Sequence, residues 1–431
     1  MPNLNSKDKQ TYWTQRAEQR LINAENLTSD MLKDLRTTYE ATIKSLEKEI
    51  NAFYGKYATE TGLDLTEVRK RLNPKELKDF KTQLKKYYDE VKRLGGYSPD
   101  IKAYLRELSA KAYISRLEEL QAQMRWQVEN LYRTQQLKIF NTLKQGYEDT
   151  YLRATFDMQQ GIGFAYSFAT LDDNKVRVAV TQKWQGSNFS DRIWADKARL
   201  IDTLNTAIPQ GVALGQNPRK VAQTIAKSMN TRYSNAERLA RTEMNHICNE
   251  SARIAYNEVP EVLQEYKIVA TLDNRTSDIC QNQDGHVYKM SEWEEGITAP
   301  PFHPSCRSCT IPYFSDVDYS TMTRIATDYE TGKSYYIPAN TDYKTWKASL
   351  SESQNKYFIA DKKAREQHNA DKKQLSEYQK LRNYAEKNGQ GELFANVPMD
   401  KIANFQTYKY TEPEKYEILK ENARIIRSEM K

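Results

Sequence analysis

The stretch from Val269 to Phe314 constrains the fold of this chain most, because it gathers the residues that can cross-link a structure. It holds three of the four cysteines and two of the four histidines among 431 residues. Few large aliphatic side chains accompany them, so an apolar core alone would hold this segment weakly. We therefore expect a compact Cys/His knot over residues 269–314, tied together by its own side chains.

The spacing of these residues predicts a structural zinc ion. Cys306 and Cys309 are separated by two residues, which brings two thiolates within reach of one metal ion. His303 lies just before them, and short strands would bring Cys280 in from the other end of the loop. Together they make a Cys3His set, a usual ligand set for closed zinc sites.

Two other readings of the same residues stay open. Cys280 and Cys306 could form a disulfide after cell lysis or in an extracellular particle. Alternatively, the cysteines and His303 could pack and hydrogen-bond without any metal. Four cysteines in so long a chain do not form a disulfide framework.

The knot also contains acid and base groups, so a metal-dependent nuclease is a second function class to consider. The spacing of these groups follows no paired ligand motif of the HxxxH or DxD kind, and we predict that the chain is not an enzyme. Asp273, Arg275 and Thr276 suit a turn in which Arg275 bonds a nearby carboxylate or carbonyl. Asp284-Gly285 suits the two-residue turn of a hairpin.

Composition indicates an extended, largely helical protein. Hydrophobic residues make up 39% and charged residues 29%, with a mean hydropathy of -0.86, which is too polar for one compact globule. The net charge of +7 is compatible with DNA contact. The sequence contains no apolar run that suits a membrane span and no secretory signal, so we expect synthesis in the cytosol and no membrane partner.

Apolar periodicity predicts helices over most of the chain. Leu32, Leu35, Tyr39, Leu46 and Ile50 mark a narrow seam in the first of them. The predicted helices cover residues 7–57, 65–72, 74–94, 100–158 (the longest), 190–207, 217–226, 235–258 and much of 340–388. Short strands are predicted at residues 266–272, 286–288, 310–313 and 335–338.

The predicted fold class is therefore mainly α, with a small α+β domain. A long N-terminal helical hairpin or bundle occupies residues 1–160. Central helices and a small antiparallel sheet, stapled by Cys and His, occupy residues 161–315, with a loop at Gly211 and Gly215. A helical tail rich in Lys and Tyr occupies residues 316–431.

Some single residues also carry expectations. Cys248 lies on a small-residue face of its helix and is expected to be a buried thiol. His246 lies off that face and is expected either at the surface or in contact with a metal-binding residue without binding the ion itself. In the tail, aromatic side chains are expected to be available for docking; they are Phe405, Tyr408, Tyr410 and Tyr416.

Several separated motifs follow one another in the order found in a known family. Arg241 and Glu243 open a helix within Ala-Arg-Thr-Glu, and Asp273, Arg275 and Thr276 follow in Ala-Thr-Leu-Asp-Asn-Arg-Thr. Cys280, Asp284-Gly285 and Pro-Pro-Phe-His-Pro-Ser-Cys-Arg complete the series. Over residues 190–315 the chain resembles the phage head morphogenesis, or minor head, proteins of the Mu F-like type. That family often closes with Cys-Arg-Cys, whereas this chain has Cys306-Arg307-Ser308-Cys309.

The resemblance implies a structural component of the virion, placed inside the phage head and assembled in the host cytoplasm. It implies association with the portal protein and with other capsid or scaffold proteins, and a part in head assembly, DNA packaging and ejection. Contact with packaged double-stranded DNA is a further expectation. The alternatives are a metal-dependent nuclease or toxin carried in the head, and a helical adaptor unrelated to phages.

Overall fold

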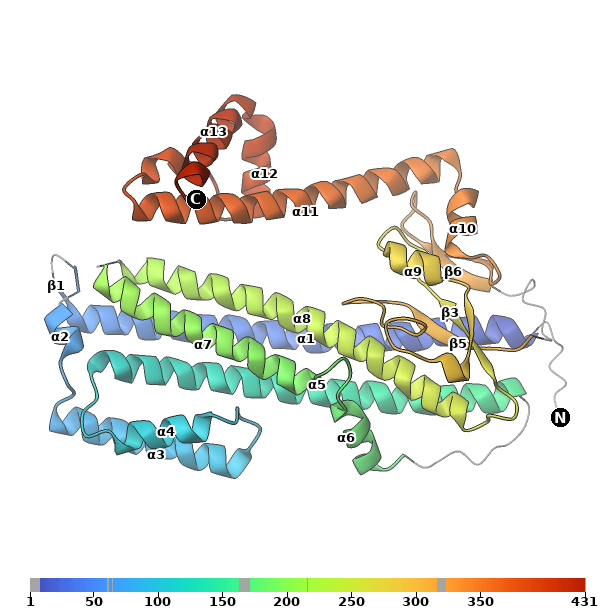
Figure 1. Cartoon of the computed structure of the whole chain (residues 1–431), viewed down its shortest axis with the longest axis horizontal. Helices are drawn as coiled ribbons and strands as arrows, with labels where there is room; N and C mark the ends of the chain where they lie inside the picture. Colours follow the sequence, from blue (N-terminus) through green and yellow to red (C-terminus); the bar gives the residue numbers. More distant parts are fainter. Residues whose placement is uncertain are drawn as a thin grey trace. The chain divides into compact units, whose positions relative to one another are not determined.

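The computed structural model describes residues 8–59, 62–63, 65–162, 171–214, 216–315 and 323–430, which fall into two compact units (Figure 1). The chain is mainly helical with a small antiparallel sheet, as predicted. The first unit comprises Met1–Thr271, Thr276–Ile325 and Tyr336–Tyr343, and the second comprises Leu272–Arg275, Ala326–Tyr335 and Lys344–Lys431.

Long helices of the first unit pack side by side around one apolar core (Figure 1). Helices from before and after residue 160 share this core, because α8 contacts both α1 and α5. The predicted seam is confirmed: Leu32, Leu35, Tyr39, Leu46 and Ile50 are all buried. Burial of each such side chain stabilises the fold by roughly 1.5–3 kcal/mol. The four helices are α1 (Asp8–Tyr57), α5 (Arg116–Ile162), α7 (Phe189–Ala213) and α8 (Pro218–Asn257).

A helical hairpin, α3 (Pro74–Leu94) and α4 (Ile101–Ala110), makes a second apolar cluster with the start of α5. Asn73 caps α3 by accepting a hydrogen bond from the Glu76 amide, and the Asn73 amide in turn donates to the Glu76 carboxylate. Such a capping box satisfies two amides that have no partner within the helix.

The prediction of one longest helix over residues 100–158 is wrong. The chain forms α4 and α5 with a break between Ala110 and Arg116, and α1 has 50 residues against 47 in α5. The break is fixed at Ser115, whose amide donates to Glu118 Oε2 (2.7 Å) and whose Oγ accepts from the Glu118 amide (3.2 Å). This pair is a capping box, so Ser115-x-x-Glu118 starts a new helix.

Of two breaks predicted further along the chain, the first lies later than predicted, between Ala213 of α7 and Pro218 of α8, and the second is wrong. Gly211 lies inside α7, while Gly215 falls outside the described residues. Ser234 does not cap a new helix, because α8 runs through it without interruption. The Ser234 hydroxyl instead donates to the Asn230 carbonyl one turn earlier (3.2 Å), a bond that Ser makes inside helices.

A three-stranded antiparallel sheet has β3 (Glu265–Val269) at its centre, between β4 (Val287–Lys289) and β5 (Cys309–Tyr313). In the register, Tyr266 lies opposite Tyr288 on one side and Pro312 on the other. Three of the four predicted strands form this sheet and are confirmed. Asp284-Gly285 connects α9 (Asp278–Gln283) to β4, however, and does not form the turn of a two-strand hairpin.

The tail contains a helical core of its own within the second unit. Phe405, Tyr408 and Tyr416 are buried in it, so the prediction that they are free for docking is wrong, and of that set Tyr410 is exposed. The rings of Phe405 and Tyr416 meet edge to face, with centroids 6.3 Å apart. The helices of this core are α11 (Glu352–Lys387), η3 (Gly391–Phe394), α12 (Ile402–Thr411) and α13 (Pro413–Glu429).

Shorter elements connect these parts. Among the described helices, none has the length and apolar character needed to cross a membrane. The remaining elements are β1 (Ala58–Thr59), β2 (Gly62–Leu63), α2 (Leu65–Arg69), α6 (Asp173–Thr181), η1 (Met290–Glu292), β6 (Thr323–Thr327), β7 (Ser334–Pro338) and α10 (Tyr343–Ser349).

Candidate metal centre

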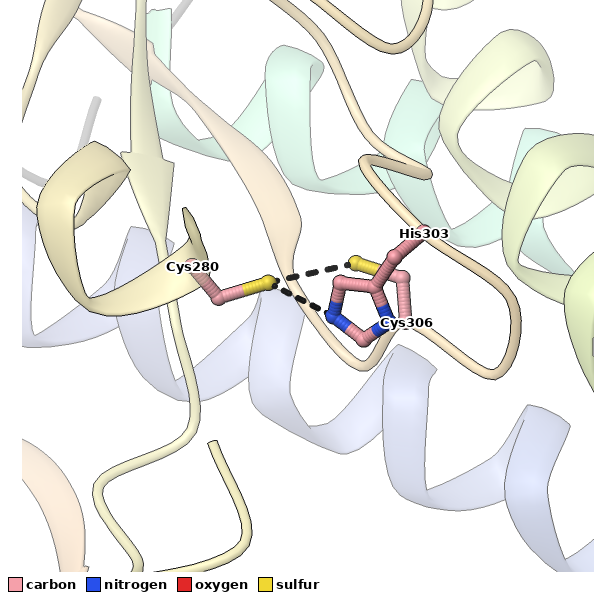
Figure 2. Close-up of side chains that lie close together, drawn as sticks. All are labelled: Cys280, His303 and Cys306. Atoms are coloured by element: carbon pink, nitrogen blue, oxygen red, sulfur yellow. Dashed lines mark hydrogen bonds between the residues drawn. The ribbon is translucent and has the colours of Figure 1, made fainter. Parts of the chain in front are cut away.

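Three of the four predicted ligands meet in one cluster (Figure 2). Cys280 comes from α9, and His303 and Cys306 come from the loop before β5. Cys280 Sγ lies 3.2 Å from His303 Nε2 and 3.6 Å from Cys306 Sγ. All three donor atoms lie within 4.8 Å of one another, so one ion could contact them together.

Local backbone structure explains why these side chains converge. Ser277 caps α9, and its Oγ accepts from the Cys280 amide (3.3 Å), which fixes Cys280 in the first turn. A tight turn joins the other two residues, since the Cys306 amide donates to the His303 carbonyl (3.1 Å). Ser305 occupies this turn with φ 60°, a left-handed conformation unusual for serine. Its amide donates to Thr242 Oγ1 of α8 (2.9 Å), which holds the turn in place.

The protonation of the cluster follows from its hydrogen bonds. His303 Nδ1 lies 2.9 Å from the Pro304 carbonyl, which can only accept, so Nδ1 carries the proton and Nε2 is left as an acceptor. The bond with Cys280 raises the pKa of His303. The bond with Cys306 and burial raise the pKa of Cys280 to about 12. The hydrogen bond with Cys280, together with the Ser308 amide that donates to the sulfur, lowers the pKa of Cys306 to about 6.

The fourth predicted ligand, Cys309, lies elsewhere. It begins β5 opposite Val269 and packs against an apolar cluster that includes Trp13 and Tyr256. Burial raises the pKa of its thiol to about 12. The extended strand carries Cys309 away from the turn that holds Cys306, so the two-residue spacing does not bring both sulfurs to one point.

Asp284 does more than shape a turn, because it is the centre of a buried hydrogen-bond network. It is buried, and its carboxylate accepts from the amides of Ala270 and Tyr343, each at 2.7 Å. The Arg324 guanidinium bonds both of its oxygens, at 2.8 and 3.0 Å. The sequence did not indicate Arg324, which lies in strand β6 and belongs to no recognisable motif. Gly285 follows with φ 82°, a conformation suited to glycine.

The predicted turn after β3 has the expected bonds. Asp273 Oδ1 accepts from the Arg275 amide (2.9 Å), and the Arg275 guanidinium lies 3.3 Å from Asp273 Oδ2. Thr276 Oγ1 donates to the Thr271 carbonyl. These bonds are all local to the turn, so this motif fixes the backbone conformation of the turn.

Arg241 and Glu243 of the α8 motif differ in their surroundings. Arg241 pairs with Glu237 one turn earlier, with a closest distance of 3.3 Å. Glu243 is buried, accepts from Trp184 Nε1 (2.8 Å) and pairs with Arg192. Burial raises the pKa of Glu243 against the effect of these two partners. No local pattern in the sequence indicated Trp184 or Arg192.

Of the two positions predicted for His246, the one at the surface is wrong. His246 is buried and stacks on Trp184, with ring centroids 4.4 Å apart, and its Nδ1 lies 3.1 Å from Glu295 Oε1. An aromatic partner from the loop before α7 covers it, which the periodicity of α8 could not indicate. Cys248 is buried as predicted.

Comparison with known proteins assigns the segment that carries this site. Residues 202–311 match the family described as "Phage Mu protein F like protein". This segment belongs to the Mu F-like family. It includes Arg241, Glu243 and all four predicted metal ligands, and the predicted resemblance to phage minor head proteins is confirmed.

Two curated proteins are similar over longer stretches. The chain is 25% identical to "Minor head protein GP7" of Bacillus phage SPP1 over 303 residues, covering 66% of this chain and 94% of that protein. It is 24% identical to "NAD(+)--arginine ADP-ribosyltransferase EFV" of Enterococcus faecalis over 199 residues, covering 42% of this chain and 41% of that enzyme. No solved structure matches the chain with significance.

Proposed function

We propose that this Mu F-like protein is a structural component of a phage head, assembled in the host cytoplasm and retained in the virion. The observation that carries the proposal is the similarity to a minor head protein across 94% of that protein's length. The largely polar helical fold with narrow apolar seams is compatible with a protein that assembles with others.

Deleting the gene from its phage and complementing it in trans tests this role. Heads made with the intact gene should contain the protein by mass spectrometry, and heads made without it should show lower infectivity. Normal, fully infectious particles without the protein would contradict a role in the head. Absence of the protein from purified wild-type heads would contradict its place in the virion.

For partners, we propose the portal protein and neighbouring capsid or scaffold proteins. Leu152 and Phe156 of α5 support a protein partner, because they lie four residues apart on one helix face and are 60% and 50% exposed. Exposed apolar side chains that adjoin one another suit a protein interface. Leu152→Asp/Phe156→Asp should abolish copurification with tagged portal protein, whereas Val178→Asp, at an equally exposed site on α6, should not. Equal copurification of all variants would contradict this surface.

A role in DNA packaging or ejection would bring the chain to packaged DNA. The net charge of +7 supports contact with phosphates. Binding to a duplex should then weaken steeply as salt rises, because counterions are released on binding. The measurement is fluorescence anisotropy over a salt series, and binding that does not depend on salt would contradict phosphate contact.

We propose that the chain acts without catalysis. Three acidic groups of the knot have structural partners: Asp284 is bonded by Arg324 and two amides, Asp273 by Arg275, and Glu295 lies against His246 of α8. Such engaged groups are poorly placed to bind and activate a substrate.

The competing function is an enzyme carried in the head, either a metal-dependent nuclease or a toxin. The similarity to an ADP-ribosyltransferase favours the toxin form, although it covers 41% of that enzyme. Plasmid cleavage with Mg²⁺ or Mn²⁺ tests the nuclease, and transfer from labelled NAD⁺ to host proteins tests the transferase. Activity that purifies with the chain and is lost on a point substitution would overturn the structural proposal.

A further inference from the structure

The geometry points to a zinc site made by three side chains, Cys280, His303 and Cys306, without Cys309. This site is independent of the proposed role in the phage head, because it rests on the cluster alone. We assign one Zn²⁺ ion to two thiolates and one imidazole nitrogen, with a water molecule as the fourth ligand in the isolated chain.

The distances between donor atoms fit a tetrahedral ion. Zinc bonds to sulfur and nitrogen place two sulfurs about 3.8 Å apart and a sulfur and a nitrogen about 3.5 Å apart. Cys280 Sγ and Cys306 Sγ are 3.6 Å apart, and Cys280 Sγ and His303 Nε2 are 3.2 Å apart. A disulfide would need the two sulfurs at about 2.05 Å. The spacing therefore suits a shared ion better than a covalent bond.

Hydrogen bonds and burial around the donor side chains favour metal binding. The Pro304 carbonyl accepts a hydrogen bond from His303 Nδ1, which leaves Nε2 facing Cys280 Sγ (Figure 2). A backbone carbonyl is a usual outer partner of a metal-bound histidine. The Ser308 amide donates to Cys306 Sγ at 3.5 Å, and such amide bonds favour a thiolate. Cys280 and Cys306 are 2% and 3% exposed, which shields the sulfurs from solvent oxidants.

The donor set selects zinc among common metal ions. Two thiolates and one imidazole are soft and borderline ligands, which suit Zn²⁺ and disfavour Mg²⁺ and Ca²⁺. Among the described residues, this is the one group of three or more His, Cys, Asp or Glu side chains with donor atoms so close together. His303 is partly exposed, so solvent can reach the fourth position.

The ion would tie two parts of the knot that are far apart in sequence. It would link α9 to the loop before β5, across the 23 and 26 positions that separate Cys280 from His303 and Cys306. Its loss should loosen this loop and lower the melting temperature.

Metal analysis of the full chain tests the assignment. Protein purified under reducing conditions would be equilibrated with Zn²⁺, desalted and analysed by mass spectrometry of the elements. Wild type should hold about one zinc per chain, and Cys280→Ser, Cys306→Ser and His303→Ala should hold less than about a tenth. Cys309→Ser and Cys248→Ser are matched controls, because both replace buried or partly buried cysteines outside the cluster and should keep the ion.

A spectroscopic measurement on the wild type covers the case in which a variant fails to fold. Cobalt(II) in place of zinc should give intense visible bands of a tetrahedral site with thiolate ligands, and chelation should remove them and lower the melting temperature. Zinc below about a tenth of an equivalent in reduced wild type would overturn the assignment. A Cys280–Cys306 disulfide that persists in protein purified under reducing conditions would also overturn it, as would loss of zinc in Cys309→Ser with retention in Cys280→Ser.

Discussion

Arg324 and Asp284 form an ion pair that is almost fully buried, with Nη1 and Oδ2 2.8 Å apart and side chains 2% and 0% exposed. Arg324 also donates to the carbonyls of Ala270 and Thr341. The pair thus joins β6 to the end of β3 and to the turn after α9. A desolvated pair of this kind costs much more to break than a surface pair.

Arg324→Met should therefore destabilise the first unit strongly. Removing one partner leaves the Asp284 carboxylate buried without its counter-charge, which typically costs about 3–5 kcal/mol. Urea unfolding followed by circular dichroism measures the loss. Lys33→Met is the matched control, because its partner Asp30 and Lys33 itself are 76% and 79% exposed. Similar losses for both variants would contradict the importance of burial.

Glu18→Gln should make stability less sensitive to pH. Glu18 accepts from the Ile325 amide at 3.0 Å, and burial raises its pKa from 4.5 to about 7. Between these values the folded chain holds a proton that the unfolded chain has lost, so stability falls as pH rises from about 4.5 to about 7. The loss is on the order of 3 kcal/mol for this shift.

Melting temperatures of wild type and Glu18→Gln over pH 4–8 check this effect. The glutamine variant keeps an acceptor for the Ile325 amide but cannot ionise, so its curve should be flatter across that window. Its gain over wild type should be largest above about pH 7, where Glu18 is charged in both states. Parallel curves would show that Glu18 ionises freely in the folded chain.

The sequence predicts the helical parts of the fold better than their continuity. Periodic apolar residues located α1, α3 and α8 because one face of each packs on a core. The break at Ser115 and the unbroken run through Ser234 depend on which bond a single hydroxyl makes. Serine can either cap a helix or bond within one, so the sequence alone does not decide between them.

At the candidate site too, the sequence indicates local features but not tertiary contacts. Spacing identified Cys280, His303 and Cys306, since a turn and a helix cap are local features. It failed to place Cys309 because strand β5 pairs with β3, a contact that depends on tertiary structure. Arg324 was not predicted for the same reason, because it lies 40 residues from Asp284 in the sequence and meets it only in the folded chain.

Gly211→Ala should destabilise the first unit although alanine favours helices. A methyl group at Gly211 of α7 would overlap Val221 Cγ2 of α8. Valine is stiff at χ1, so it cannot turn away easily. The gain in helix propensity is about 1 kcal/mol, while overpacking costs about 1–3 kcal/mol, so we expect a net loss.

Gly55→Ala provides the matched control for this substitution. Gly55 lies near the end of α1, is exposed, and has no atom within 4 Å of the position its methyl would take. It should stabilise the chain by about 0.5–1 kcal/mol through helix propensity alone. Thermal unfolding of both variants measures the difference, and a stabilising Gly211→Ala would mean that α7 and α8 separate more readily than their packing indicates.

Asp371→Ala should destabilise the helical core of the tail. Asp371 of α11 is fully buried, and its carboxylate accepts from Lys409 Nζ (2.7 Å), Gln406 Nε2 (2.8 Å) and the Tyr410 hydroxyl (3.0 Å) of α12. One side chain thus fixes how α12 packs on α11. Losing its bonds to a charged group and to neutral groups should cost about 3 kcal/mol. Fluorescence-monitored urea unfolding of the chain measures this loss.

Asp400→Ala, which removes an exposed carboxylate bonded to Asn404, should change stability much less. An equal effect of the two substitutions would contradict a special role for the buried carboxylate.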